Sequence, residues 1–502
     1  MEKFYITTSI PYVNATPHLG NVLDSVYADV LARYHRQRGA DVRFLTGSDE
    51  HGVKIARSAA ARFAGEPRPS DGREAVPTEI IQRFVDETSA KFRALKETLN
   101  LSWDDFIRTS DQQRHWPGAQ KLWNALAAQG DLYKKSYKGL YCVGHEAFVT
   151  DKDLDNGVCK DHQKKPEIIA EENWFFKLSK YSKEIESRIK NQELRIVPEG
   201  KRHEILSLLK EGLEDVSFSR PSKDLSWGVP VPGDPTQTMY VWADALANYI
   251  SALGYGSTSS PQVDDSEKDF KKYWPADVQV IGKDNLRFHA AIWPGMLLSA
   301  GLPLPKTVFV HGFLTVDGQK ISKTVGNVID PVELVKKYGT DPVRYYLLRE
   351  VSPFEDGDFS YEKFEAAYNG DLANGIGNFS ARVLALAEKA GNLAAGKASP
   401  EIEAAIQKTR EELEEKIGEY KFHEAASVIW GLISFGDSYV NEKKPWQNPD
   451  PGVLLDLVTI LENVAELLSP FIPGTAEKIS KCIVREGKIL KIKKGEVLFP
   501  RL

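Results

Sequence analysis

The sequence predicts an α/β protein in which a long insertion divides a parallel sheet and an all-helical region follows. Near the N-terminus a buried strand (4–13), a helix (21–37) and a second strand (41–46) follow one another, as in a right-handed βαβ unit. Two further apolar strands, 278–281 and 307–310, occur far downstream. We therefore expect both pairs to belong to one Rossmann-like sheet.

Beyond residue 356 the apolar residues follow helical spacing, and Pro and Gly separate the segments. The clearest predicted helices are 376–390, 400–418, 421–442 and 450–468. This region is expected to form a helical bundle.

Length and composition narrow the class of protein. At 502 residues the chain is too long for one hydrophobic core, and 42% hydrophobic with 27% charged residues is typical of globular domains. No apolar run is long enough for a membrane helix, so no membrane partner is expected. Three cysteines argue against a disulfide scaffold and favour a cytoplasmic location. The net charge of −6 argues against unspecific attraction to nucleic acid but leaves a local basic surface possible.

A first motif, Pro17-His18-Leu19-Gly20-Asn21, stands where the first strand gives way to the first helix. Helix N-termini offer unpaired N–H groups and a partial positive charge, which suit a triphosphate. An imidazole can donate a hydrogen bond to phosphate, and Gly20 leaves room for an adenine ring. A single match of this length is more often only a helix cap.

A second motif, Lys320-Ile321-Ser322-Lys323-Thr324, carries two lysines three residues apart. Two such charges can close over a pentacoordinate phosphorus and a departing pyrophosphate. Alone, the motif would be assigned to a solvated basic loop. The order of the two motifs, at opposite ends of a split sheet and ahead of a helical bundle, favours a common function.

Together the two motifs resemble the "HIGH" and "KMSKS" signatures of class I aminoacyl-tRNA synthetases. Further blocks are similar to the methionyl-tRNA synthetases in particular, from residue 4 to beyond 446: the opening segment 4–20, TGSDEHG at 46–52, YVWADA at 240–245, GKDNLRFH at 282–289 and HGFL at 311–314. The resemblance implies activation of L-methionine with ATP, accompanied by Mg²⁺, and transfer of the methionyl group to tRNA(Met).

The resemblance also implies a methionine pocket. Aromatic walls suit the polarizable thioether, and Asp49 would bind the α-ammonium through a charge-assisted bond. Outside these blocks the aromatic residues would be assigned to core packing and Asp49 to a turn. Asn285 replaces a usually apolar residue and Leu246 a proline of some members, which leaves the finer shape of the pocket open. The implied residues are Ile10, Tyr12, Asp49, Trp242, Ala245, Tyr249, Asn285, His289 and Trp293.

Roles around ATP follow from the same resemblance. His18 and Asn21 would bond the phosphates, and Lys320 and Lys323 would neutralise the transition state; these four are the implied catalytic residues. A carboxylate in the turn after the strand 278–281 would bond the ribose hydroxyls. The implied ATP-binding residues are Pro17, His18, Gly20, Asn21, Arg220, Gly282, Lys283, Asp284, Lys320, Ser322 and Lys323.

Two Cys-x-x-His pairs, Cys142 with His145 and Cys159 with His162, have the spacing of a tetrahedral zinc site. The family usually has cysteine where His145 stands, and histidine remains a competent ligand. We expect a structural Zn²⁺ without an open coordination position. The alternative is a hairpin that has lost its metal.

In the helical region, Asn378 and Arg382 lie four residues apart on one helix face, and Pro445-Trp446 follows a later helix. By resemblance these residues bind the tRNA anticodon: Asn and Arg bond the first base, and Trp446 stacks on an unstacked base. Taken one at a time, such residues are mostly solvated or cap a bundle.

The predicted fold is a split Rossmann-like parallel sheet with an inserted connective domain carrying a zinc-knuckle-like hairpin, followed by a C-terminal α-helical bundle. The expected domains are 1–115 and 221–310 for the two halves of the catalytic fold, 116–220 for the insertion with its knuckle at about 140–165, 311–355 for the KMSKS region and 356–502 for the anticodon-binding bundle. The chain ends at Leu502 soon after the bundle, so a monomer is expected.

Two alternatives stay open. One is a class I synthetase for another apolar amino acid such as leucine, valine or cysteine. The chain has no insertion of the size that editing requires, which weighs against leucine and valine. The other is a non-catalytic tRNA-binding paralogue, against which the intact His18, Lys320 and Lys323 argue. The sequence leaves a preference for initiator or elongator tRNA open.

Overall fold

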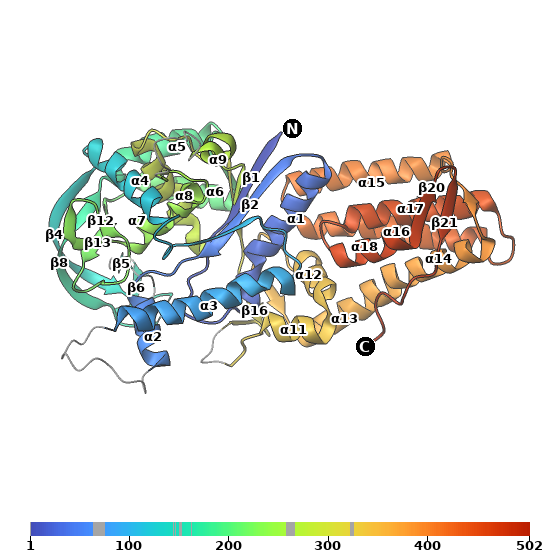
Figure 1. Cartoon of the computed structure of the whole chain (residues 1–502), viewed down its shortest axis with the longest axis horizontal. Coiled ribbons are helices and arrows are strands. Elements are labelled where there is room, and N and C mark those ends of the chain that lie inside the picture. Colours follow the sequence, from blue (N-terminus) through green and yellow to red (C-terminus); the bar gives the residue numbers. More distant parts are fainter. Residues whose placement is uncertain are drawn as a thin grey trace. The chain divides into compact units, whose positions relative to one another are not determined.

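The computed structural model describes residues 2–63, 76–143, 145, 147–149, 153–161, 163–257, 267–321 and 326–502. Its internal contacts divide the chain into two compact units. Unit 1 consists of Met1–Pro17, Gly39–Ala94 and Trp103–Val310, and unit 2 of His18–Arg38, Leu95–Ser102 and His311–Leu502. The N-terminal part of the chain is therefore shared between the two units, as the colours of Figure 1 show.

Unit 1 is built on a six-stranded sheet with the strand order β3-β2-β1-β14-β15-β9. The pairings of β1 with β2 and β14, of β2 with β3 and of β15 with β9 are parallel. Strand β14 is buried along its whole length and β1 along nearly all of it, as expected for parallel strands covered on both faces. The strands are β1 (Lys3–Thr8), β2 (Asp41–Ser48), β3 (Asp105–Arg108), β9 (Arg195–Val197), β14 (Val278–Gly282) and β15 (Thr307–His311).

The split parallel sheet predicted from the sequence is confirmed, because β1 pairs directly with the distant β14. Two of its strands, β3 and β9, were not predicted. Both are short, and β9 comes from the segment 116–220 that was assigned to the insertion. The insertion therefore supplies an edge strand of the sheet.

A second sheet in unit 1, with the order β10-β8-β4-β5, is dominated by one long antiparallel hairpin. Its strands are β4 (Leu132–Cys142), β5 (Ala147–Val149), β8 (Glu167–Phe176) and β10 (Val216–Ser217), and the short pair β6 (Leu154–Asp155) and β7 (Val158–Cys159) lies between β5 and β8 in the chain. The strands β11 (Ser219–Pro221), β13 (Asp234–Met239) and β12 (Pro230–Val231) form a third sheet. The second sheet and the pair β6–β7 carry the segment in which a metal site was predicted.

The helices of unit 1 pack around these sheets (Figure 1). They are α2 (Val53–Arg62), α4 (Trp116–Ala128), α5 (Ser182–Lys190), α6 (Glu199–Glu211), α7 (Val241–Ala245), α8 (Asn248–Ser251), α9 (Lys268–Tyr273) and α10 (Trp293–Ser299), with shorter turns η3 (Leu178–Tyr181), η4 (Lys283–Asn285) and the π-helix η5 (Phe288–Ile292). Helix α3 (Thr78–Thr98) begins in unit 1 and ends in unit 2.

Unit 2 contains η1 (Leu19–Val22), α1 (Leu23–Gln37) and a series of C-terminal helices, which confirms the predicted bundle (Figure 1). The sequence predicts its main helices to within a few residues, because Pro and Asp mark their starts; the Asp450 side chain, for example, accepts a hydrogen bond from the backbone N–H of Gly452. No helix among the described residues is long and apolar enough to cross a membrane. The helices are α11 (Pro331–Tyr338), α12 (Thr340–Arg349), α13 (Tyr361–Ala367), η6 (Tyr368–Gly377), α14 (Asn378–Ala390), α15 (Pro400–Gly418), α16 (Phe422–Lys443), α17 (Pro451–Leu468) and α18 (Pro473–Cys482).

Two small sheets complete unit 2. One has the order β17-β16-β18 and the other β19-β21-β20. Their strands are β16 (Leu314–Val316), β17 (Gln319–Lys320), β18 (Gly357–Phe359), β19 (Leu393–Ala394), β20 (Ile483–Glu486) and β21 (Ile489–Ile492). The first of these sheets carries the start of the second motif.

A buried ion pair lies in the core of unit 2. Arg344 on α12 and Asp29 on α1 are both fully buried, and Nη2 of Arg344 lies 2.8 Å from Oδ2 of Asp29. The same guanidinium donates to the carbonyl oxygens of Leu99, Pro470 and Phe471. One side chain thus ties together three segments of unit 2 that are distant in sequence.

Candidate active site

Five of the residues predicted for methionine meet in the apolar core of unit 1. The rings of Tyr249 and Trp293 are buried, with centroids 5.9 Å apart. Trp242 is half-buried and stacks on Phe288 with centroids 3.5 Å apart. Flat aromatic walls of this kind suit a flexible thioether. The five predicted residues in or against this core are Ile10, Trp242, Ala245, Tyr249 and Trp293.

His289 joins Tyr249 to the turn that follows β14. Its Nδ1 lies 3.0 Å from the carbonyl oxygen of Asn285, and its Nε2 lies 2.6 Å from the hydroxyl of Tyr249. Because a carbonyl can only accept, Nδ1 carries the proton, and in neutral imidazole Nε2 then accepts from Tyr249. The half-buried Asn285, which departs from the family pattern, thus orients His289 through its main chain.

Asp49 and Tyr12 lie on adjacent segments that follow β2 and β1. They form a parallel β-bridge, in which the N–H of Asp49 donates to Pro11 and its carbonyl accepts from Val13. The hydroxyl of Tyr12 donates to the carbonyl of His51 at 2.6 Å. Both segments stand at the carboxyl edge of the parallel sheet, where ligands bind in open α/β folds.

A buried cluster that the sequence analysis missed connects this segment to α7. Asp244 lies 2.9 Å from Nδ1 of His51 and 3.7 Å from Nε2 of His115, and all three residues are buried. Nδ1 of His115 lies 2.9 Å from the hydroxyl of Ser251. Burial alone would raise the pKa of Asp244, but the two histidines outweigh it and lower this pKa. His51 and Asp244 belong to the family-like blocks at 46–52 and 240–245, and this was the sequence signal that could have identified them.

The turn predicted to contact the nucleotide directly follows β14. Gly282 is buried at the end of the strand, Lys283 is half-buried and Asp284 is exposed in η4. These residues lie beside the end of β1, because β1 and β14 are parallel neighbours. The structure therefore places this turn at the same edge of the sheet as the segment of Tyr12.

The side chain of Arg220 on β11 is buried among other side chains. Its guanidinium lies 3.1 Å from Glu171 and sits over the rings of Tyr141 and Tyr240, at 4.5 and 5.0 Å from their centroids. Burial works to lower its pKa, but the neighbouring tyrosines and Glu171 raise it. This arrangement links the metal-site strand β4 to the start of α7, and a role at the phosphates stays a prediction.

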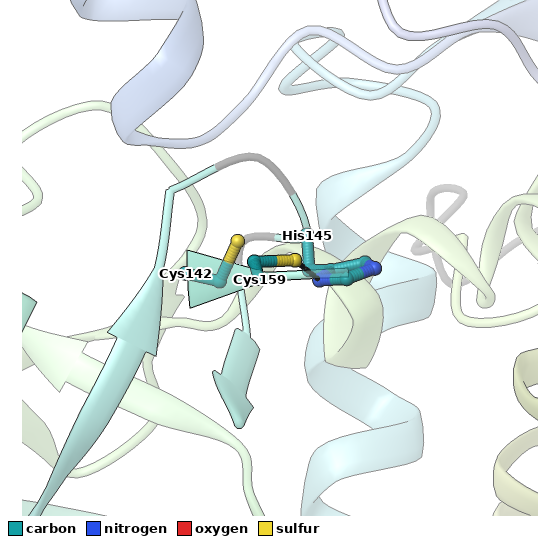
Figure 2. A group of neighbouring side chains, drawn as sticks. All are labelled: Cys142, His145 and Cys159. Atoms are coloured by element: carbon teal, nitrogen blue, oxygen red, sulfur yellow. Dashed lines mark hydrogen bonds between the residues drawn. The ribbon is translucent and has the colours of Figure 1, made fainter. Parts of the chain in front are cut away.

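The predicted metal ligands come together at the end of β4. One ligand atom each from Cys142, His145 and Cys159 lies within 4.8 Å of the other two, and Figure 2 shows the three side chains converging. Sγ of Cys159 is 3.5 Å from Nδ1 of His145, and Nε2 of His145 is 2.9 Å from Asp161. A carboxylate on the distal nitrogen is the usual second partner of a metal-binding histidine. The donor set therefore fits zinc, and the fourth predicted ligand, His162, lies outside the described residues.

In unit 2 the two motifs lie against each other. His18 is the N-cap of η1, and the side chain of Asn21 accepts from its backbone N–H at 3.1 Å. A Cβ added to Gly20 would lie 3.3 Å from Cδ1 of Ile321 in the second motif, and the N–H of Leu19 donates to the carbonyl of Ile329. A side chain at position 20 would therefore crowd His18 and Ile321, and glycine allows this close approach.

Lys320 is exposed at the end of β17, and its ammonium lies 6.0 Å from the ring of Phe313. The side chain of Asn327 donates to its carbonyl oxygen at 3.2 Å, so the two ends of the loop are joined. Ser322 and Lys323, also predicted for ATP, lie outside the described residues. Pro17, the first residue of the first motif, is buried.

Three of the predicted anticodon residues lie close to one another in unit 2. Arg382 on α14 donates to Asp437 and Asn441 on α16, and its Cζ is 5.9 Å from the ring centroid of Trp446. Trp446 is 47% exposed although it is a large aromatic residue, and it directly follows the buried Pro445. Burial raises the pKa of Asp437, and Arg382 opposes this shift. Asn378, one turn before Arg382, is exposed.

Family models match most of the chain. A model described as "tRNA synthetases class I (M)" matches residues 4–159 and 149–384, and one described as "Anticodon-binding domain of tRNA ligase" matches residues 400–497. The second match covers the helices α15 to α18 and both strands of the C-terminal hairpin.

Curated relatives and solved structures agree with these matches. The methionine–tRNA ligase of Brucella suis is 42% identical over 95% of this chain and 91% of its own length. That of Caldanaerobacter subterraneus is 40% identical over 100% of this chain and 79% of its own length. The structure of Mycobacterium tuberculosis methionyl-tRNA synthetase in complex with methionyl-adenylate has a TM-score of 0.89, at 34% identity and full coverage of both chains.

Proposed function

The chain belongs to the methionyl-tRNA synthetases of class I, and from this premise we propose how its residues divide the work of the reaction. In the first step the enzyme joins L-methionine to ATP, forming methionyl-adenylate and releasing pyrophosphate. In the second step it transfers the methionyl group to the 3′-terminal adenosine of tRNA(Met). The packing of five of the residues predicted for methionine in one apolar core of unit 1 is the single structural observation that supports the choice of amino acid.

A pyrophosphate-exchange panel over the amino acids tests this function. Methionine should support exchange far better than leucine, valine or cysteine, because the aromatic walls favour a thioether. Exchange with one of the other three and not with methionine would reassign the substrate. No exchange with any amino acid would favour a non-catalytic tRNA-binding protein.

We propose that Asp49 binds the α-ammonium of methionine while Tyr12, Trp242, Tyr249 and Trp293 enclose its side chain. The buried carboxylate can form a charge-assisted bond, and its main chain is held by the segment of Tyr12. The remaining residues of this proposed site are Ile10, Ala245, Asn285 and His289. So oriented, one carboxylate oxygen of methionine attacks the α-phosphorus of ATP in line, and the bond from that phosphorus to pyrophosphate breaks.

We propose that His18, Asn21 and Lys320 contact the phosphates, together with Lys323. The contact of Gly20 with Ile321 supports a shared task for the two motifs. Positive charges and hydrogen-bond donors stabilise the charge that develops in this transition state, so no protein nucleophile is needed. Mg²⁺ is proposed to accompany the triphosphate and to screen its charge. The further proposed ATP contacts are Pro17, Gly20, Arg220, Gly282, Lys283, Asp284 and Ser322.

Transfer to tRNA then follows. A hydroxyl of the terminal ribose attacks the carbonyl carbon of the adenylate, the bond to AMP breaks, and the hydroxyl proton leaves with the departing phosphate or water. We propose that Asn378, Arg382, Pro445 and Trp446 select the tRNA through its anticodon. The exposure of Trp446 beside Arg382 supports stacking on a base.

We propose a structural zinc ion held by Cys142, His145, Cys159 and His162. The ion would fix the hairpin and supply no step of the reaction. Elemental analysis of the purified protein should find about one zinc per chain, and Cys159→Ser should lower this content and the thermal midpoint together. Far less than one zinc in the wild-type protein would exclude the site.

We also propose a monomer in the cytoplasm, and we keep the five domains predicted from the sequence. The break between the units at Val310 and His311 supports the boundary between 221–310 and 311–355.

A further inference from the structure

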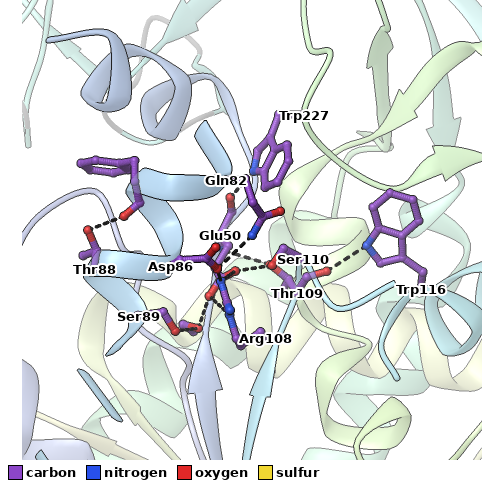
Figure 3. Close-up of polar contacts among 12 residues, drawn as sticks. Glu50, Gln82, Asp86, Thr88, Ser89, Arg108, Thr109, Ser110, Trp116 and Trp227 are labelled. Carbon is purple, nitrogen blue, oxygen red and sulfur yellow. Dashed lines mark hydrogen bonds and ion pairs between the residues drawn. The ribbon is translucent and has the colours of Figure 1, made fainter. Parts of the chain in front are cut away.

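Glu50 lies between Asp49 and His51 and is fully buried, although the sequence alone gives it no role. Its carboxylate accepts from the hydroxyl of Ser48 at 2.6 Å and from Nε and Nη2 of Arg108 at 2.7 and 2.9 Å. The hydroxyl of Ser110 donates to it as well. Figure 3 shows Arg108 and Ser110 beside the carboxylate.

The main chain of Glu50 is held just as closely. Its N–H donates to the hydroxyl of Thr109 at 2.9 Å, and its carbonyl accepts from the indole N–H of Trp227 at 2.6 Å (Figure 3). Side chain and main chain together make six hydrogen bonds to residues 48, 108–110 and 227. We call this group the Glu50 clamp.

The clamp acts on the opposite side of the chain from the pocket. Ser48 and Glu50 bond each other on one side of the chain, and because side chains alternate in extended backbone, Asp49 and His51 are expected on the other side. His51 bonds Asp244 of the pocket helix α7, while Glu50 bonds the end of β3. The bonds of Glu50 therefore hold the main chain directly beside Asp49.

Stability alone is a weak reason for this arrangement. The carboxylate and much of the guanidinium lose water, and this desolvation cost commonly cancels the attraction of a buried ion pair. Arg108 also pairs with Asp86 on α3 at 2.5 Å, so it is fixed from two sides. Such a network limits movement more than it adds free energy of folding.

We propose that Glu50 is a positioning residue for the α-ammonium of methionine: held by Arg108, Ser110 and Ser48, it fixes the direction in which Asp49 points. This inference rests on the proposed role of Asp49. The clamp acts through Asp49 alone, touching neither substrate. Its loss should weaken the binding of the ammonium and spare the binding of the thioether.

The test compares Glu50→Gln with Asp131→Asn as a matched control. Asp131 is also a buried carboxylate of unit 1, bonded to Lys180, Tyr181 and Ser299. Both variants should lose thermal stability. Only Glu50→Gln should raise the KM for methionine in pyrophosphate exchange, by roughly tenfold, because small misplacements of a binding group have large effects. The KM for ATP should stay within about twofold of wild type.

A ligand without the ammonium isolates the effect. The inhibition constant of 4-(methylthio)butanoate, which is methionine without its amino group, should be unchanged in Glu50→Gln. Should its inhibition constant rise as much as the KM for methionine, the clamp acts on the whole pocket and the proposal is wrong. The proposal is also wrong if Glu50→Gln behaves like Asp131→Asn.

Two further variants keep the test decisive. Adding Glu50→Gln to Asp49→Asn should cause no additional loss of methionine affinity, because a residue that acts through another has no separate effect. Additive losses would contradict the proposal.

If Glu50→Gln does not fold, Ser110→Ala serves in its place. This variant removes one bond to Glu50 and should raise the KM for methionine by about threefold. An unchanged KM would overturn the proposal. Wild-type exchange that does not depend on methionine would instead refute the proposed function.

Discussion

In unit 1, four buried polar residues are sequence neighbours or hydrogen-bonded partners of residues around the proposed methionine pocket: His51, Asp244, His115 and Glu50. In unit 2 the buried ion pair of Asp29 and Arg344 lies on α1 and α12, whereas the proposed tRNA contacts lie on α14 and after α16.

This difference follows from the kind of ligand. A small amino acid is selected by fixed groups in a dry site, so the same buried bonds serve stability and binding. An RNA loop is bound by stacking and edge contacts at a surface, so stability and binding rest on different residues. Mutations should therefore separate the two properties in unit 2 and fail to separate them among the buried polar residues around the methionine pocket of unit 1.

The largest effect is expected for Arg344→Met. It removes one of the two cations of Asp29, the other being Arg33, and leaves three buried carbonyl oxygens without their donor, which should lower the free energy of unfolding by about 3–5 kcal/mol. Chemical denaturation measures this loss, and the KM of the folded enzyme for tRNA should not change. Arg410→Met is the control, because its pair with Glu466 is partly exposed and should contribute less than about 1 kcal/mol. Equal losses for both variants would contradict the prediction.

In unit 1, His51→Gln should impair both properties at once. The buried Asp244 loses its closest partner, at a cost of about 1.5–3 kcal/mol, and the KM for methionine should rise with it. Denaturation and pyrophosphate exchange are the two measurements. His203 is 69% exposed, and His203→Gln should change stability by less than about 0.5 kcal/mol. A stability loss with an unchanged KM would show that the properties are separable here too.

Trp446→Ala should weaken tRNA binding and leave the amino-acid step intact. Loss of one stacked base costs about 1–3 kcal/mol, which would appear in the KM for tRNA(Met). Pyrophosphate exchange without tRNA and the unfolding midpoint should match wild type. Tyr361, 47% exposed on α13, provides a control of the same exposure, and Tyr361→Ala should not affect the KM for tRNA. The assignment of Trp446 fails if the two variants have equal tRNA affinities.

The smallest effect concerns acid stability. The folded-state pKa of Asp244 lies below the ordinary value of 3.8, so its contribution is fully present above that pH and is lost as the pH falls through the folded-state pKa. The stability difference between wild type and Asp244→Asn should therefore shrink between about pH 5 and pH 3. Urea denaturation at the two pH values measures it. If the stability difference between wild type and Asp244→Asn grows toward low pH, the pKa of Asp244 is not lowered in the folded protein.

Local sequence signals predicted the sheet and the helices well. Strands such as β14 are continuous apolar runs, and helices such as α15 and α17 begin at Pro400 and Pro451, where the missing N–H costs nothing. The strand β9 escaped prediction because its three residues show no periodicity. It is recognisable only from its pairing with β15.

Site residues could be predicted where they stand in contiguous sequence blocks. Residues whose bonding partners are distant in sequence could not. Asp49 and Trp242 were named from their blocks, whereas Arg108 and His115 lie outside every block. Their partners Glu50 and Asp244 are 58 and 129 residues away in the chain, and such pairings are invisible without the fold. The roles assigned to individual site residues, including Lys323 and His162, stay predictions.

Helix α1 is synthesised early, but some of the residues on which it packs are synthesised late. It belongs to unit 2, where the ring of Tyr27 stacks on Phe422 with centroids 5.1 Å apart, and Asp29 pairs with Arg344. At a synthesis rate of about 5–20 residues per second, roughly 20 to 80 seconds separate Tyr27 from Phe422 on the ribosome. During this interval the helix can pack on α12 and pair Asp29 with Arg344, but the face of Tyr27 that stacks on Phe422 stays uncovered. The core around α1 is therefore complete only after α16 has emerged.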